Sequence, residues 1–268
     1  MAGTYRSLLL LVLAVAAARV PYGLLAVDVK GSSVISTKNR SVATTAAVIE
    51  HPVFFNMEGL LSDTISEDMI LQGLNDLVYN NYSDLYFLYS GRVLESQGVS
   101  FTHALISRFP SSEALQTYYD FAIPDIVEKM RPWLKNEYCV DFTAEMDESM
   151  LELNIDNDFV TYVIFIKVSL NVSDSDVVKA MDAFNALIDV GYAVQLTSGE
   201  NMYFLELYRT MSHGFVAYFS SEADLAAWKN DTIVAEVIDG IILPLADSYA
   251  VASVKPFAGN SGVTNSVD

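Results

Sequence analysis

The chain is short of cysteine and of basic residues, and each shortage excludes a class of protein. Cys139 is the sole cysteine among 268 residues, so no internal disulfide can form and packing must hold the fold. The 15 lysines and arginines are outnumbered by 34 aspartates and glutamates, which gives a formal charge of −19. Such a chain repels phosphate backbones, so we expect no nucleic-acid partner.

Motifs for common catalytic and metal chemistry are also missing. We find no phosphate-binding loop, dinucleotide fingerprint or nucleophile elbow. The three histidines, His51, His103 and His213, lack the short spacing of a metal motif. We therefore expect neither a cofactor nor a metal ion. With 52% apolar residues, the chain can still bury a sizeable core.

The N-terminal apolar run is too short to span a membrane. It covers about 11 residues, Leu8 to Ala18, whereas a bilayer core needs about 20. Arg6 before the run and alanines at its end are typical of a secretory signal peptide, so we expect cleavage of residues 1–18. Residues 19–49 then form a flexible leader. An uncleaved signal anchor and a plastid or mitochondrial transit peptide remain alternatives.

Four glycosylation sequons favour the secretory pathway or the extracellular space. They begin at Asn39, Asn81, Asn171 and Asn230. Some sequons arise by chance in a chain rich in serine and threonine, so the signal is modest. Cys139 lies in a predicted strand, where we expect a buried and inert thiol.

The chain contains two copies of one sequence pattern. Residues 101–109 are echoed about 110 positions later by residues 211–219, and Tyr118 corresponds to Trp228. Each copy is long enough for a small domain. We place the repeats at 50–142 and 159–257, an acidic surface linker at 143–158, and a disordered tail at 258–268.

Within each copy, the hydrophobic period changes between strand and helix in the order β-α-β-β-α-β. Such a unit has helices on one face of its sheet and leaves the other face uncovered. We expect the two units to press these faces together within one chain, as an internal pseudo-dimer. The strand face bearing Leu105 and Phe109 is the one that we expect at this contact.

Short motifs occur in an order known from one family. They are His51, Ser90-Gly91-Arg92, Phe101-Thr102-His103, Arg108-Phe109, Leu115-Gln116-Thr117-Tyr118 and Asp141-Phe142. With these motifs the chain resembles the stress-responsive dimeric alpha/beta barrel domain family. The resemblance implies an α+β fold of two tandem ferredoxin-like units, packed sheet to sheet as an intramolecular dimeric α/β barrel.

The resemblance argues against an enzyme. The family's polyketide cyclases use a tyrosine and a histidine six residues later. The tyrosine matches Tyr118, but the histidine position is Pro124 here, and the pair becomes Trp228 and Val234 in the second copy. Proline and valine cannot transfer a proton, so the acid–base step of the family is missing.

Three functions stay open. We rank first a non-catalytic barrel that binds an apolar small molecule or a protein partner. The alternatives are a polyketide cyclase-like or monooxygenase-like enzyme that uses a barrel cavity, and a purely structural or defence protein. The candidate ligand-binding residues are His51, His103, Tyr118, His213 and Trp228. The histidines would line the barrel interior, although we favour a structural, hydrogen-bonded role for them. We expect no membrane span after signal cleavage, and further self-association stays open.

Overall fold

The computed structural model describes residues 45–79, 84–202 and 211–257, and these form two α/β units. The predicted signal peptide, most of the leader and the tail lie outside the described residues. So do the sequons at Asn39 and Asn81. Among the described residues, no helix combines the length and apolar character needed to cross a membrane.

The first repeat follows the expected order, with its closing strand in two pieces. Its elements are β1 (Thr45–Asn56), η1 (Glu58–Ser62), α2 (Thr64–Asn75), η2 (Asp76–Tyr79), β2 (Phe87–Gln97), β3 (His103–Phe109), α3 (Ser112–Thr117), the π-helix η3 (Tyr118–Ala122), α4 (Ile123–Met130), β4 (Asn136–Cys139) and β5 (Phe142–Asp147).

The second repeat has the same order after a short helix, η4 (Glu148–Met150). Its elements are β6 (Val160–Val168), α5 (Asp174–Ala186), η5 (Leu187–Val190), β7 (Gln195–Glu200), β8 (His213–Phe219), α6 (Glu222–Lys229), α7 (Thr232–Val237), the π-helix η6 (Ile238–Ile242), η7 (Leu243–Leu245) and β9 (Ala246–Val254). Ser173 caps α5, because its side chain accepts a hydrogen bond from Asp176 N at the start of the helix.

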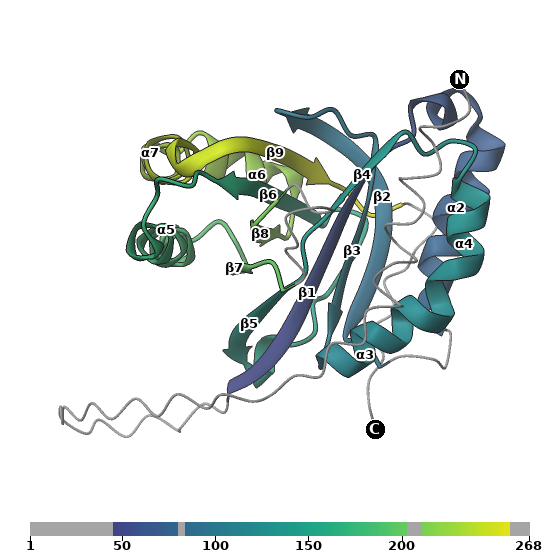
Figure 1. Ribbon diagram of the computed structural model, residues 1–268, viewed down its shortest axis with the longest axis horizontal. Coiled ribbons are helices and arrows are strands. Elements are labelled where there is room, and N and C mark those ends of the chain that lie inside the picture. The colour runs from purple at the N-terminus through teal and green to yellow at the C-terminus, as the bar shows by residue number, and fades with distance from the viewer. Residues whose placement is uncertain (1–44, 80–83, 203–210, 258–268) are drawn as a thin grey trace.

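The strands of both repeats join into one antiparallel sheet (Figure 1). Across the described residues, the order is β4-β1-β3-β2-β9-β6-β8-β7, and β5 also pairs with β1. The last strand of the second repeat, β9, lies between β6 of its own repeat and β2 of the first. Backbone hydrogen bonds therefore connect the halves, and the chain is a pseudo-dimer of two tandem units. The predicted fold class is confirmed.

Two glycines at equivalent positions bring the repeats together. A Cβ on Gly91 would lie 1.8 Å from the carbonyl oxygen of Lys255, and one on Gly199 would lie 2.7 Å from the Phe142 ring. Lys255 follows β9 and Phe142 begins β5, so each glycine faces the closing strand of the other repeat. The Ser-Gly motif is explained by this close approach, which a side chain would block.

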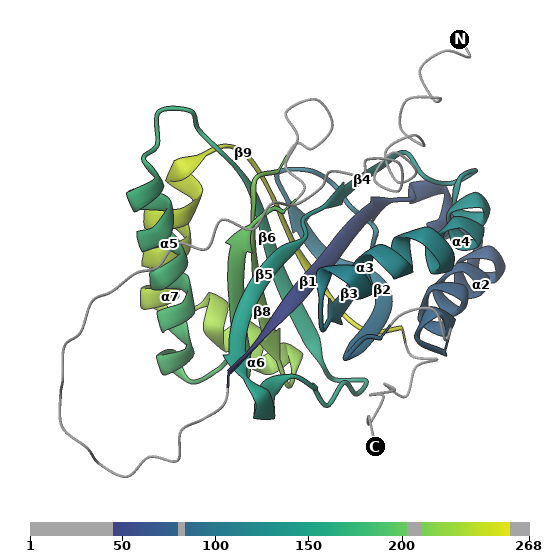
Figure 2. The same cartoon turned by 60° about the horizontal axis from the view of Figure 1, so that its bottom comes forward.

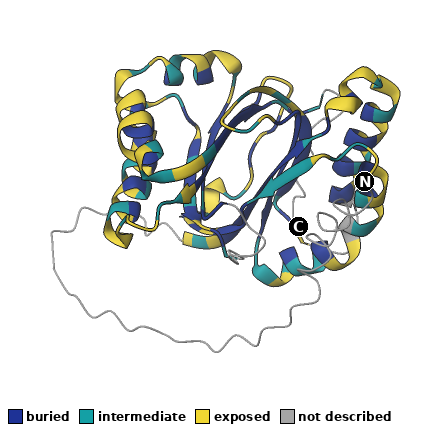
Figure 3. Cartoon of the chain, turned by 45° about the horizontal axis from the view of Figure 1, so that its top comes forward, coloured by how far each residue is buried: buried dark blue, intermediate teal, exposed yellow. Residues whose placement is uncertain are grey.

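The curled sheet separates three apolar layers. Helices α2 and α4 lie on one outer side, and α5 and α7 lie on the opposite side (Figure 2). One cluster fills the space under the helices of the first repeat, a second lies under those of the second, and a third fills the barrel interior. Buried residues follow the strands, and exposed ones gather on the outer surfaces of the helices (Figure 3).

The predicted contact face is wrong. Leu105 and Phe109 pack against the outer helices, whereas Ala104 and Ile106 point into the barrel interior with Arg108. Alternation correctly divides the strand into two sets of residues. Alternation cannot show which set faces the barrel interior and which faces the helices, because both faces of the strand are buried.

The segment between the repeats is not a surface linker. Its start belongs to β5, which pairs with β1. Further on, Leu153 and Ile155 are buried in the barrel interior together with Phe159. Apolar residues alternate with polar ones here, so the acidic side chains stay outside while the apolar ones close the barrel.

Candidate functional site

Four chemically active side chains meet between the sheet and the outer helices of the first repeat. They are His51 on β1, Tyr119 in η3, Cys139 at the end of β4, and Asp141 in the gap before β5. His51 and Asp141 are 90 residues apart in sequence. Pairing of β1 with β4 and β5 brings them together.

Two prolines shape this site. Pro52 has no N–H to donate toward the closing strand, and the strand divides there into β4 and β5 while Val140 N still donates to Pro52 O. Asp141 occupies the division. Pro124 removes another donor from the second helix, which passes through the π-helix η3 just before it. Tyr118 and Tyr119 both lie buried in that turn.

The cluster is held by short contacts. His51 Nδ1 lies 2.6 Å from Asp141 Oδ1, and Tyr119 Oη donates to Asp141 Oδ2 at 2.9 Å. Cys139 Sγ donates to Asp141 Oδ1 at 3.2 Å and lies 3.5 Å from His51 Nδ1. Tyr119 Oη completes the group at 3.2 Å from His51 Nδ1 and 3.7 Å from Cys139 Sγ. One nitrogen, one sulfur and the oxygens of two side chains therefore lie within contact distance of one another.

Tyr118 packs beside this cluster without joining it. Its ring meets the His51 ring edge-on and packs against the tilted ring of Phe109. The hydroxyl is buried and has no hydrogen-bond partner within the described residues, and burial raises the pKa of Tyr118 well above its ordinary value. Nε1 of Trp228, at the same position of the second repeat, also lacks a partner there. Tyr118 and Trp228 therefore both pack within the cores of their repeats.

A second polar group joins α2 to β2 and β3. Glu67 is buried and accepts a hydrogen bond from Arg92 Nε at 2.5 Å, while His103 Nε2 lies 2.9 Å from Glu67 Oε1. The hydrogen bond from Arg92 lowers the pKa of Glu67. Burial lowers the pKa of His103, although Glu67 opposes this effect. Thr102 Oγ1 contacts the other ring nitrogen of His103, so this histidine is fully engaged.

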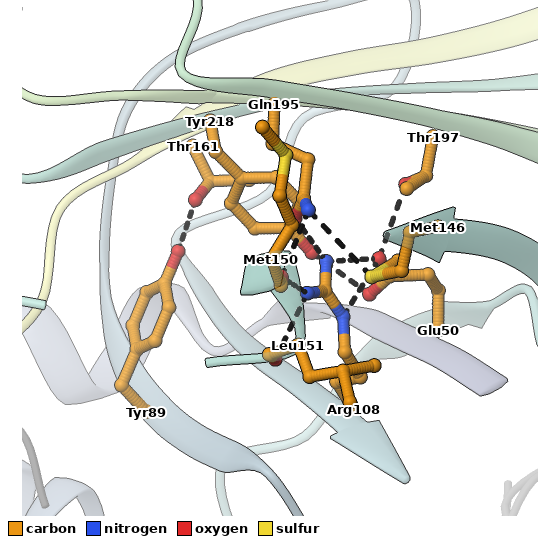
Figure 4. Close-up of polar contacts among 10 residues, drawn as sticks. All are labelled: Glu50, Tyr89, Arg108, Met146, Met150, Leu151, Thr161, Gln195, Thr197 and Tyr218. Atoms are coloured by element: carbon orange, nitrogen blue, oxygen red, sulfur yellow. Dashed lines mark hydrogen bonds and ion pairs between the residues drawn. The ribbon is translucent and has the colours of Figure 1, made fainter. Parts of the chain in front are cut away.

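The barrel interior holds a third polar group around Arg108 (Figure 4). Arg108 donates to Glu50 Oε1 at 2.6 Å through Nη2 and at 3.1 Å through Nε. Nη2 also donates to Gln195 at 2.5 Å, and Nη1 donates to the carbonyl oxygens of Met150 and Leu151. Two of these partners lie in the segment that closes the barrel. A buried charge of this kind requires such complete pairing.

Glu50 in turn connects the two repeats. It accepts hydrogen bonds from Tyr218 at 2.8 Å and from Thr197 at 3.2 Å, both in the second repeat. Nearby, Tyr89 and Thr161 form another hydrogen bond across the repeats. Aromatic and aliphatic side chains occupy the rest of the interior. This polar group therefore stabilises the contact between the halves.

The structure divides the predicted site residues among separate places. His51, His103 and Tyr118 face the outer helices. The less favoured interpretation, in which the histidines line the barrel interior, is wrong for His51 and His103, and both are hydrogen-bonded. His213 is half-buried at the start of β8, with Nδ1 at 2.9 Å from Ser212 Oγ, and burial lowers its pKa. Trp228 packs against Tyr162 and Phe219 in the second repeat.

Sequence reasoning missed Tyr119, Asp141 and the Arg108–Glu50 pair as interacting groups. Arg108 and Asp141 stand in two of the motifs that carry the family resemblance. The position of Arg108 in a largely apolar strand could have indicated a buried charge that needs a partner. No local pattern connects Tyr119 with a partner that lies 22 residues away.

Comparisons with known proteins agree with this architecture. Residues 160–255 match the model of the stress responsive A/B barrel domain. A stress-response A/B barrel domain-containing protein of Arabidopsis thaliana is 26% identical over 211 residues, which cover 74% of this chain and 96% of that protein. The chain therefore carries a stress responsive A/B barrel domain, as predicted.

Solved structures show the fold alone. A proposed monooxygenase from Fusobacterium nucleatum matches with a TM-score of 0.51 at 6% identity, over 79% of this chain and 92% of that one. A hydroxynitrile lyase from Passiflora edulis matches with a TM-score of 0.35 at 12% identity, over 38% of this chain and 96% of that one.

Proposed function

We propose that this A/B barrel protein is non-catalytic and binds a protein partner, namely a basic segment with an apolar face. The binding surface is the outer side of η1 and α2. One observation carries the proposal: Leu61, Ile65 and Met69 are 43%, 75% and 68% exposed. They are spaced four residues apart and form an apolar stripe, which we call the α2 stripe.

The α2 stripe differs from an ordinary helix surface. α2 already buries Ile70, Leu71 and Leu74 against the sheet. The opposite face of such a helix is usually polar. A second apolar row that points to solvent marks a contact with another molecule.

Charge indicates the chemistry of that partner. Residues 58–79 contain no lysine, arginine or histidine. Asp68 and Asp76 are exposed beside the stripe, while the exposed Glu58 pairs with Lys135. A second copy of a chain with charge −19 would be repelled. A basic amphipathic helix would match both the apolar stripe and its acidic border.

The remaining sites favour binding over catalysis. The interior is filled with side chains, and its charged groups are paired with one another. A surface groove of about 400 Å³ lies outside the barrel, between β2 and α6, where Lys229 pairs with Glu95. The acid–base partner expected at Pro124 is missing, and the Tyr118 hydroxyl makes no hydrogen bond to a described residue that could activate it.

The test uses designed peptides and matched variants. A helical Leu/Lys peptide should bind the full chain, and Ile65→Ser/Met69→Ser should weaken binding at least about tenfold, since two apolar contacts are lost. Leu170→Ser is the control, because Leu170 is 97% exposed but distant in sequence from the stripe. Equal binding by the stripe variant, or by a scrambled Leu/Lys peptide, would refute a defined docking surface.

A second assay addresses the enzyme alternative. The wild-type chain should not accelerate the cyclisation of a linear polyketide above the uncatalysed rate. Turnover that disappears in Tyr118→Phe, with stability retained, would instead establish the cyclase-like function.

We also propose that the chain enters the secretory pathway. The signal-like N-terminus supports this route, and Asn171 and Asn230 are exposed in the structure. Mass spectrometry of the native protein should find Arg19 near the N-terminus and glycan on Asn81 or Asn171. An intact Met1 with unmodified asparagines would place the protein elsewhere.

A further inference from the structure

We propose that His51, Cys139 and Asp141 form a binding site for a Zn²⁺-like cation, with the Tyr119 hydroxyl at the fourth position. These four groups supply one nitrogen, one sulfur and two oxygens from separate elements. The three metal-ligating atoms of His51, Cys139 and Asp141 all lie within 4.8 Å of one another. The site is independent of the α2 stripe and of the barrel interior.

The separations between Cys139 and the other three groups are close to those of a tetrahedral site. Metal–ligand bonds of about 2.0–2.3 Å place tetrahedral ligand atoms about 3.3–3.7 Å apart. The sulfur of Cys139 lies 3.5 Å from His51 Nδ1, 3.7 Å from Tyr119 Oη and 3.2 Å from Asp141 Oδ1. The two contacts to the carboxylate from His51 and Tyr119 are shorter, at 2.6 Å and 2.9 Å, because a proton lies between the atoms. A cation that replaces those protons needs only a small expansion.

The charge of the ligands and their chemical softness favour a divalent, zinc-like ion. A thiolate and a carboxylate carry two negative charges, which balance a divalent cation and limit the cost of burying it. Imidazole and thiolate ligands favour zinc over magnesium or calcium. His51, Tyr119 and Asp141 are buried, while Cys139 is half-buried and opens the site to solvent.

The surroundings hold the ligands in place. Asp141 N donates to Asn201 Oδ1 at 3.3 Å, and Asp141 O accepts from Met202 N at 2.7 Å. These bonds come from the second repeat, so the contact between the repeats fixes the backbone that carries the Asp141 side chain. Loss of a group that holds a ligand in place typically weakens metal binding about 10–100-fold.

The second repeat cannot form an equivalent site. Tyr162 stands at the position of His51, and Lys229 stands at the position of Tyr119. The chain should therefore bind one Zn²⁺, and a second equivalent should bind weakly or not at all.

Cobalt provides a direct test on the full chain after removal of metal with a chelator. Co²⁺ bound to a thiolate gives a charge-transfer absorption band, and Cys139 is the sole cysteine in the chain. We expect this band to saturate at one Co²⁺ per chain and to be displaced by Zn²⁺. Zn²⁺ should also raise the temperature of unfolding, since it binds the folded state.

Variants locate the site. Cys139→Ser should abolish the band, and Tyr119→Phe should keep it while weakening Zn²⁺ binding about 10–100-fold. His213→Asn is the control, because it removes a histidine from the other repeat and should leave binding unchanged. The metal-free melting temperature of each variant shows that it has folded. Absence of the band at stoichiometric Co²⁺, or unchanged Zn²⁺ affinity in Cys139→Ser, would overturn the proposal.

Discussion

Replacement of Glu50 by glutamine should remove much of the protein's stability, because it leaves a buried guanidinium without its counter-charge. Arg108 is fully buried, and Glu50 is its carboxylate partner at 2.6 Å. Removal of one partner from a buried ion pair costs about 3–5 kcal/mol. Since domains are stable by only about 5–15 kcal/mol, Glu50→Gln should lower the free energy of unfolding by about 3–5 kcal/mol.

A double variant separates the charge from the packing. In Glu50→Gln/Arg108→Met, the unpaired charge is gone and a long apolar side chain occupies the space near Phe87, above which the guanidinium lies at 4.8 Å. The oxygen at position 50 can still accept from Tyr218. We therefore expect the double variant to be more stable than Glu50→Gln alone by about 1–3 kcal/mol.

Urea unfolding followed by circular dichroism, at low and high salt, measures these differences. Salt should hardly change the cost of Glu50→Gln, since the pair is buried. Glu128→Gln is the matched control, because the exposed Glu128–Arg131 pair should be close to neutral. A loss below about 1 kcal/mol for Glu50→Gln, or a double variant less stable than this single one, would refute the reasoning.

Four further outcomes are expected. Gly91→Ala should destabilise the chain by about 1–3 kcal/mol through its clash with the facing backbone, whereas Gly240→Ala, with open space around it, should be nearly neutral in urea unfolding. Tyr118→Phe should leave the free energy of unfolding unchanged or raise it by up to about 1 kcal/mol, because it removes an unpaired hydroxyl; a measured loss would reveal a hidden partner. Burial lowers the pKa of His103 from 6.5, so below that pH the unfolded chain binds a proton that the folded chain does not. Stability should therefore fall as the pH decreases through 6.5, and His103→Gln should reduce that slope. Residues 50–142 alone should dimerise or aggregate, since the barrel face is exposed; a monomer in sedimentation at micromolar concentration would contradict this.

Much of the fold could be predicted from local pattern. The order of strands and helices follows from the hydrophobic period, which each short segment carries within itself. The duplication provides a second reading of each element, because a strand or helix with a weak pattern in one copy can be compared with its counterpart in the other. The Ser-Gly pairs at Ser90-Gly91 and Ser198-Gly199 could likewise be recognised, although their reason became visible only where each glycine meets the other repeat.

The candidate site could be predicted only in part. His51 and Tyr118 were identified through the family resemblance, and they do pack together. The partners Tyr119, Cys139 and Asp141 were not identified, because their meeting depends on a π-helical turn and on a strand that divides opposite Pro52. Both are small departures from regular structure, and periodicity describes only the regular part.

The sequence by itself determined the two repeats, the α+β class, the acidic composition and the presence of Pro124 where the cyclases that it resembles carry a histidine. These properties depend on the identity of residues and on neighbours a few positions away. The tertiary structure decided which strand face fills the barrel, where the segment between the repeats goes, and which polar groups meet. Those results depend on contacts such as Glu50 with Tyr218, 168 residues apart. When both faces of a strand are buried, only the complete packing of the chain distinguishes them.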